Sequence, residues 1–147
     1  MEKNPNDRGL GPDEKTLDVP AADEKLNDVI AFMNAFLEAH DCPMKVQMQL
    51  ELVVEEVFVN IAHYAYPDSA GMARLQLSAR DGVLTLVFSD NGVPYDPLQK
   101  ADPDVTLPAD ERQIGGLGIF LVKKNTDSVG YRYENGQNVL TLTKKLR

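Results

Sequence analysis

Two Asx-Gly pairs constrain the fold of this chain more than any other feature. Asp81-Gly82 lies between "MARLQLSAR" (72–80) and "VLTLVFSD" (83–90), and Asn135-Gly136 lies between "VGYRYE" (129–134) and "NVLTLTKKL" (138–146). An Asx-Gly pair between two runs rich in β-branched and aromatic residues is a strong hairpin signal. The sequence therefore predicts two β-hairpins, which would supply most of a sheet.

Three further segments show helical spacing of apolar residues. Such spacing runs from about Ala22 to His40 and from about Met44 to His63, and "LGIFLVKKN" (117–125) offers a shorter third helix. An extended segment, "TLDVP" (16–20), precedes them. Because these helices are too few to cover both faces of a sheet, we expect an α/β (α+β) two-layer sandwich, a mixed β-sheet with helices on one face.

Length, charge and cysteine content narrow the class of protein. A chain of 147 residues is sized for one domain, which we place at residues 16–147 behind a polar, disordered lead of residues 1–15. A formal charge of -8 argues against binding nucleic acid or anionic membrane through a general positive field. Cys42 is the single cysteine, which excludes an intrachain disulfide and a cysteine-based zinc cluster. With no apolar run near the ~20 residues of a membrane helix, we expect a cytoplasmic protein.

The second helix carries two glutamates and an asparagine, "EEVFVN" (55–60), inside an otherwise apolar pattern. At roughly 100° per residue, Glu55 points away from the apolar stripe, whereas Glu56 and Asn60, spaced i and i+4, share one flank of it. An ordinary surface glutamate beside a tolerated asparagine is one explanation. The other is chemical, because an amide oxygen can ligate Mg²⁺ and a carboxylate can take a proton from a hydroxyl nucleophile.

Asp90 and Gly92 follow a predicted strand directly, in "SDNGVPYDP" (89–97). Such a segment is commonly no more than a turn. In a binding site, Asp90 would present a hydrogen-bond acceptor suited to an exocyclic amine such as that of adenine. Gly92 would let the backbone approach a flat ring closely.

A glycine-rich turn opens the third helix in "IGGLGIFLV" (114–122). Gly115, Gly116 and Gly118 would leave backbone N–H groups at a helix N-terminus free to bind phosphate. The pattern is neither a Walker A loop nor a GxGxxG after a strand, and a flexible entry to a packed helix is the alternative. The long connection of residues 91–116 is typical of a binding loop, a lid or a disordered segment.

Taken in order, "EEVFVN", "DNGVPYDP" and "GGLGIFLV" resemble the N, G1 and G2 boxes of the GHKL ATPase superfamily, which includes gyrase and histidine-kinase ATP domains. Within it, the "NIAHYAYP" continuation, the Pro-Tyr-Asp-Pro tail and the closing "GYRYENGQNVLTLTKK" resemble the small anti-sigma factor serine kinases. The resemblance runs from about Thr16 to Lys145. It implies the GHKL (Bergerat) ATP-binding fold, with ATP and Mg²⁺ as cofactors.

The resemblance implies a role for each matching residue. Glu56 corresponds to the catalytic glutamate, the general base toward a serine hydroxyl of a protein substrate, and Asn60 corresponds to the Mg²⁺ ligand. Asp90 matches the aspartate that binds the adenine amino group, and Gly92 matches the glycine beside the ring. Pro94 stands where the wider superfamily has a second glycine, a change that the anti-sigma branch commonly tolerates.

The same resemblance assigns phosphate contacts to a turn of Gly115, Gly116, Leu117 and Gly118. It assigns a mobile ATP lid to about residues 98–114. Arg112 in that lid is a candidate for the γ-phosphate, because a cation should offset the transferring charge; an ordinary surface arginine is the alternative. His63, one helical turn after Asn60, either borders the site or packs at the helix end.

Two functions remain open at this point. The first is a serine protein kinase of the partner-switching type, a homodimer like its relatives, which phosphorylates a serine of a small antagonist protein and alternately sequesters a sigma factor. The second is a non-catalytic ATP- or ADP-binding module that sequesters a protein partner. The presence of Glu56 and Asn60 favours the kinase. Neither function requires direct contact with nucleic acid or membrane.

Overall fold

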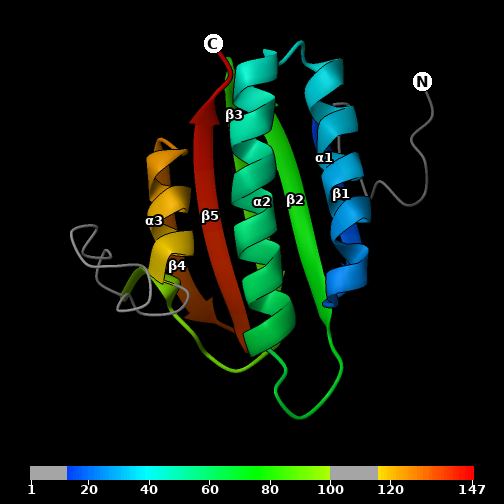
Figure 1. Cartoon of the computed structure of the whole chain (residues 1–147), viewed down its shortest axis with the longest axis vertical. Helices are drawn as coiled ribbons and strands as arrows, with labels where there is room; N and C mark the ends of the chain where they lie inside the picture. The colour runs from blue at the N-terminus through cyan, green and yellow to red at the C-terminus, as the bar shows by residue number, and fades with distance from the viewer. Residues whose placement is uncertain (1–12, 100–115) are drawn as a thin grey trace.

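Among the described residues, the two hairpins belong to one sheet of five strands. The computed structural model describes residues 13–99 and 116–147. The strands are β1 (Glu14–Pro20), β2 (Met72–Arg80), β3 (Val83–Asp90), β4 (Ser128–Glu134) and β5 (Gln137–Lys145). They lie in the order β1-β2-β3-β5-β4 (Figure 1), so β3 and β5 form the middle of the sheet.

Both predicted hairpins turn at the expected pairs. Asp81-Gly82 joins β2 to β3 and Asn135-Gly136 joins β4 to β5, with φ values of 54°, 78°, 54° and 76°. Positive φ at both central residues is the signature of a type I′ turn, whose twist matches that of the strands it joins. Asx-Gly adopts this backbone at low cost, which is why the two pairs predict the hairpins correctly.

The sheet differs from the expected mixed sheet, because each of its four pairings between described strands is antiparallel. Two helices connect β1 to β2, so the chain returns in the opposite direction. One helix connects β3 to β4, an arrangement that suits a parallel pair, but β5 lies between these two strands and runs antiparallel to both. The predicted fold class, two layers with helices on one face, is confirmed.

In the described part of the chain, three α-helices cover one face of the sheet (Figure 1): α1 (Leu26–Ala39), α2 (Met44–Tyr64) and α3 (Gly116–Lys124). The core forms between the two layers. From the helices it contains Val29, Met33, Phe36, Leu37, Leu50, Val53, Val54, Val57, Phe58, Ile119 and Val122. From the strands it contains chiefly Leu75, Leu77, Leu84, Leu86, Phe88, Leu140 and Leu142, every second residue, as a sheet with one covered face requires.

Element boundaries differ from the predicted ones by a few residues. The helix predicted from Ala22 begins as a short 3-10 turn, η2 (Asp23–Lys25), and α1 is followed by Asp41, whose φ of 56° is left-handed. β1 begins at Glu14, slightly before the predicted domain start. The rest of the predicted lead, residues 1–12, lies outside the described residues. In the described ranges, no helix is long and apolar enough to cross a membrane.

One end of the molecule brings together segments that are far apart in the sequence. The C-terminal end of α2, the end of β3 and the start of β5 all lie at the lower end in Figure 1, and α3 begins on the same side. α2 packs against α3 as well as against α1. The residues singled out on α2, β3 and α3 therefore belong to one region.

Tyr66 ties the loop after α2 to the sheet at this end. Its hydroxyl donates a hydrogen bond to Met72 O (2.6 Å) and accepts one from Asn91 N (2.9 Å). Gly71 leaves room for the ring, because a Cβ added at Gly71 would lie 2.1 Å from a ring carbon of Tyr66. The phenol thus joins the loop to the residue that follows Asp90.

Gly71→Ala is expected to lower the free energy of unfolding by about 1–3 kcal/mol, because the Tyr66 ring must move and its two hydrogen bonds are disturbed. Gly130→Ala is the matched control, since a Cβ there meets nothing within 4 Å. We expect the control to be neutral or slightly stabilising. Urea unfolding followed by circular dichroism measures both, and equal losses in the two variants would contradict this role of Tyr66.

Candidate functional site

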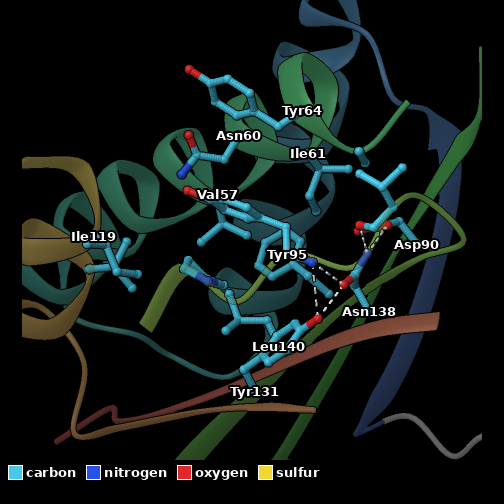
Figure 2. A pocket seen from close by; sticks show the side chains of 15 residues that line it. Val57, Asn60, Ile61, Tyr64, Asp90, Tyr95, Ile119, Tyr131, Asn138 and Leu140 are labelled. Carbon is cyan, nitrogen blue, oxygen red and sulfur yellow. Dashed lines mark hydrogen bonds between the residues drawn. The ribbon is translucent and has the colours of Figure 1, made fainter. Parts of the chain in front are cut away.

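A pocket opens between the C-terminal half of α2 and the lower part of the sheet (Figure 2). The apolar wall consists of Val57, Ile61, Ala65, Phe88, Val93, Pro97, Ile119, Val122 and Leu140. The polar and aromatic members are Asn60, Tyr64, Asp90, Tyr95, Tyr131 and Asn138. An apolar cleft with a few polar groups is suited to a flat ring that carries a few donors or acceptors.

Asp90 is the one acidic residue among the described residues that line the pocket. It is buried, and its Oδ1 accepts hydrogen bonds from Gly92 N and from Asn138 Nδ2, each 2.9 Å long. Such donors offset the cost of burying a carboxylate. Both of these bonds end on Oδ1, so Oδ2 keeps its capacity to accept a hydrogen bond from a ligand.

Asn138, at the start of β5, is a site residue that our sequence reasoning missed. It lies directly opposite Asp90 in the pairing of β3 with β5 and is 8% exposed. The available signal was the alternation of β5, since Asn138 shares the inward face with Leu140 and Leu142. A buried amide on an apolar strand face requires partners, and those partners form the network in Figure 2.

Gly92 has a packing role that the sequence does not reveal. A Cβ at Gly92 would lie 2.2 Å from Ala65 O, so the turn after β3 sits directly against the end of α2. The next residue, Val93, donates its N–H to the same carbonyl (2.8 Å). Close approach of two backbones is therefore one reason for glycine here, and contact with a flat ligand ring stays a prediction.

Three tyrosines of the described ranges line the pocket. The rings of Tyr64 and Tyr95 stack with centroids 6.1 Å apart and planes inclined by 25°. Tyr131 lies across the pocket on β4 and accepts a hydrogen bond from Tyr95 N (3.3 Å). Tyrosine rings present large apolar faces with a polar edge, which suits contact with an aromatic ligand.

The flank of α2 carries Glu56 and Asn60 in the arrangement expected from helical angles. Glu55 is exposed, while Glu56 and Asn60 are half-buried, and Asn60 lines the pocket. Glu56 instead faces the first turn of α3, where a Cβ added at Gly118 would lie 2.3 Å from Glu56 Oε2. The glycine therefore leaves space for the carboxylate between α2 and α3.

Burial raises the pKa of Glu56 above its ordinary value, and the negative charge of Glu55 raises it further. Both causes disfavour the charged form of the carboxyl group. A carboxylate with a raised pKa is a stronger base, and its proton affinity is closer to that needed near neutral pH.

α3 begins at Gly116 and continues through Leu117 and Gly118, so part of the predicted phosphate turn is its first turn. The N–H groups of a first turn have no partner within the helix and point along its axis, where they can bind an anion. Gly115, Arg112 and residues 100–114 of the predicted lid lie outside the described residues, and their roles stay predictions.

His63 is not among the residues that line the pocket. Its Nε2 lies 2.9 and 2.7 Å from the two carboxylate oxygens of Asp23, and both side chains are exposed. The contact connects the end of α2 to η2. This arrangement favours the interpretation of His63 as a helix-end residue.

The polar groups of the region fit a magnesium nucleotide. In the described part of the chain, no group of three or more His, Cys, Asp and Glu could hold a metal ion by itself. Mg²⁺ usually takes one or two protein ligands and completes its shell with phosphates and water. The Asn60 amide at the pocket is suited to that mode.

Comparisons with known proteins find relatives with similar sequences. The serine/threonine-protein kinase BtrW of Bordetella bronchiseptica is 31% identical over 100 residues, which are 67% of this chain and 70% of BtrW. The serine-protein kinase RsbW of Listeria monocytogenes is 30% identical over 96 residues, 62% of this chain and 61% of RsbW. The match thus spans under two thirds of RsbW.

A solved structure shares the fold. A Mycobacterium tuberculosis structure described as RsbU and RsbW domains superimposes with a TM-score of 0.60 at 14% identity, and covers 90% of this chain and 32% of that one. The family model described as "Histidine kinase-like ATPase domain" matches residues 19–144, nearly the whole chain. The chain belongs to the histidine kinase-like ATPase domain family.

Proposed function

We propose that this chain is an ATP-dependent serine kinase, which transfers phosphate to a serine of a partner protein and so controls which protein it binds. The observation that carries the proposal is the arrangement around the pocket. A buried acceptor, Asp90, lies in an apolar cleft that Asn60 borders, and Glu56 faces the first turn of α3 from the same helix flank.

Asp90 would select the nucleobase of the bound nucleotide. Its Oδ2 accepts a hydrogen bond from an exocyclic amine such as that of adenine, while the apolar wall and the tyrosine rings bury the flat faces of the ring. A hydrogen bond to a charged acceptor in a buried site contributes about 1.5–3 kcal/mol. This is the contribution that we assign to Asp90.

The first turn of α3 would hold the phosphates. Backbone N–H groups of Gly116 to Gly118, with Gly115 before them, would bind the phosphate oxygens, and Arg112 is a candidate for the terminal phosphate. Asn60 would ligate Mg²⁺, which neutralises phosphate charge when it is bound. Position and electrostatics would supply most of the rate.

Glu56 would act as the general base. Its carboxylate would take the proton of the substrate serine hydroxyl as that oxygen forms its bond to the γ-phosphorus. The bond from this phosphorus to the β–γ bridging oxygen breaks, and ADP leaves. The raised pKa of Glu56 suits this role, and the space left by Gly118 lets the carboxylate lie at the start of α3. The names of BtrW and RsbW, both serine kinases, support the reaction type.

The partners follow from the resemblance to the anti-sigma factor serine kinases. We propose that the phosphorylated protein is a small antagonist, that the alternative partner is a sigma factor, and that the kinase is a cytoplasmic homodimer. A non-catalytic nucleotide-binding module that sequesters a partner is the second candidate. Glu56 distinguishes the two, because a module that only binds a partner has no need of a general base.

Glu56→Gln is expected to lower phosphate transfer by at least about 100-fold, the usual contribution of a general base, and to leave ATP affinity nearly unchanged.

Asp90→Asn is expected to weaken ATP binding by about 10- to 100-fold. Gly92 N and Asn138 Nδ2 would take the oxygen of the new amide, and its NH₂ would then face the adenine amine.

Transfer from γ-labelled ATP into host proteins and equilibrium binding of ATP measure both variants. Phosphate transfer by Glu56→Gln at the wild-type rate would contradict the role of Glu56 as general base. Intact ATP binding with no labelled protein in the wild type would favour the non-catalytic module. A wild-type chain that does not bind ATP would overturn the proposal.

Glu55→Gln is expected to shift the acidic limb of the pH–rate profile to lower pH. Glu56 must be deprotonated to accept a proton, so the rate falls as pH falls through its pKa. Removing the neighbouring negative charge lowers that pKa, and the active form persists further into acid. The profile of phosphate transfer between about pH 5 and 8 measures the shift, and a limb that stays in place or moves to higher pH would contradict it.

A further inference from the structure

Asn138 occupies the point where the sheet, the turn after β3 and the pocket meet. It faces Asp90 across the β3 and β5 pair and is almost fully buried. A side-chain amide has two donor hydrogens and two acceptor lone pairs, and each of them is costly when it is left unpaired in such a place. The partners of this amide therefore reveal what the position requires.

All four hydrogen-bonding positions of the Asn138 amide are used. Nδ2 donates to Asp90 Oδ1 (2.9 Å) and to Val93 O (2.9 Å). Oδ1 accepts from Tyr95 N (3.1 Å) and from the Tyr131 hydroxyl (2.5 Å). The orientation of the amide is determined by these partners, because Val93 O can only accept and Tyr95 N can only donate.

The network determines what Asp90 offers to a ligand. Oδ1 of Asp90 already accepts from Gly92 N and Asn138 Nδ2, so the carboxylate is held in one rotamer and Oδ2 is left as the acceptor. Asn138 has no donor left for the ligand. The Asp90–Asn138 pair therefore presents an acceptor without a competing donor from the amide.

We propose that Asn138 is a positioning residue that sets base specificity, so that the pocket prefers a purine with a 6-amino group to one with a 6-oxo group. The inference rests on the proposed binding of ATP and extends it to a residue outside the three sequence boxes. A 6-oxo purine would place its acceptor oxygen against the carboxylate, which costs binding energy. Without the Asn138 bond, the carboxylate turns more freely and Oδ1 loses a donor, so the discrimination weakens.

Tyr131 offers a milder way to disturb the same network. Its hydroxyl donates to Asn138 Oδ1 and accepts from Tyr95 N, so Tyr131→Phe removes one support of the amide and keeps the ring. Thr141→Val is the matched control, because Thr141 lies on the same strand but on the face away from the pocket. Valine has nearly the shape of threonine, and the Thr141 side chain takes no part in the Asn138 network.

The test measures Kd for ATP and for ITP, two nucleotides that differ at position 6 of the base, with full-length wild type and three variants. In the wild type we expect ATP to bind at least about tenfold more tightly than ITP. Asn138→Leu should reduce this ratio at least about fivefold, Tyr131→Phe should give an intermediate ratio, and Thr141→Val should keep the wild-type ratio. The ratio does not depend on the fraction of folded protein, and if Asn138→Leu does not fold, Tyr131→Phe decides.

A merely structural role would weaken both nucleotides equally and leave the ratio unchanged, and that result in Asn138→Leu would overturn the inference. A Tyr131→Phe ratio equal to that of the wild type would do the same if the leucine variant does not fold. A wild type that binds ATP and ITP equally would also overturn it and leave ATP binding intact. A wild type that binds neither would overturn the proposed function itself, so the two failures are distinguishable.

Discussion

The antiparallel pairing of β3 with β5 is the constraint on which the site depends. This pairing sets Asp90 opposite Asn138 at one end of the sheet, inside the layer that the helices cover. A slip of one residue in register would turn Asn138 to the uncovered face and leave Asp90 without that donor. The apolar alternation that builds the core, Leu140 and Leu142 inward on β5, therefore also positions the polar pair.

Hydrogen bonds connect the turn after β3 to three other segments of the chain. Tyr66 bonds to Asn91 N, Ala65 accepts from Val93 N, and Asn138 binds both Asp90 and Val93 O. The three attachments come from the loop after α2, from the end of α2 and from β5. Groups fixed to helices and strands hold their geometry better than groups on loops, which suits a site that must recognise one base.

Local patterns in the sequence predict most of the elements, and the reasons are visible in the structure. Asx-Gly pairs adopt the positive φ of type I′ turns, so the hairpins follow from the chain itself. Helical angle separates exposed Glu55 from Glu56 and Asn60, because α2 packs one continuous face on the sheet. Strand order does not follow from such local rules. The insertion of β5 between β3 and β4 makes the sheet antiparallel where a mixed one was expected.

The contrast between local patterns and tertiary contacts also explains why the sequence did not reveal two features of the site, the packing role of Gly92 and the presence of Asn138. Gly92 packs against Ala65, which is distant in sequence, and nothing in the local motif reveals that contact. Asn138 lies shortly after a hairpin turn, where polar residues are common. Its role becomes recognisable when β3 is known to be its partner strand. Motifs identify residues with intrinsic chemistry such as Asp90, whereas positioning residues become visible once tertiary neighbours are assigned.

A crystal structure with a non-hydrolysable ATP analogue and Mg²⁺ would show directly whether Asp90 binds the adenine amine. We expect the adenine to lie in the pocket, with its 6-amino nitrogen about 3 Å from Asp90 Oδ2 and with Asn138 still bound to Oδ1. The phosphates should run to the first turn of α3, with Asn60 on the metal. An analogue bound elsewhere, or an adenine whose amine does not reach Asp90, would contradict the role proposed for Asp90.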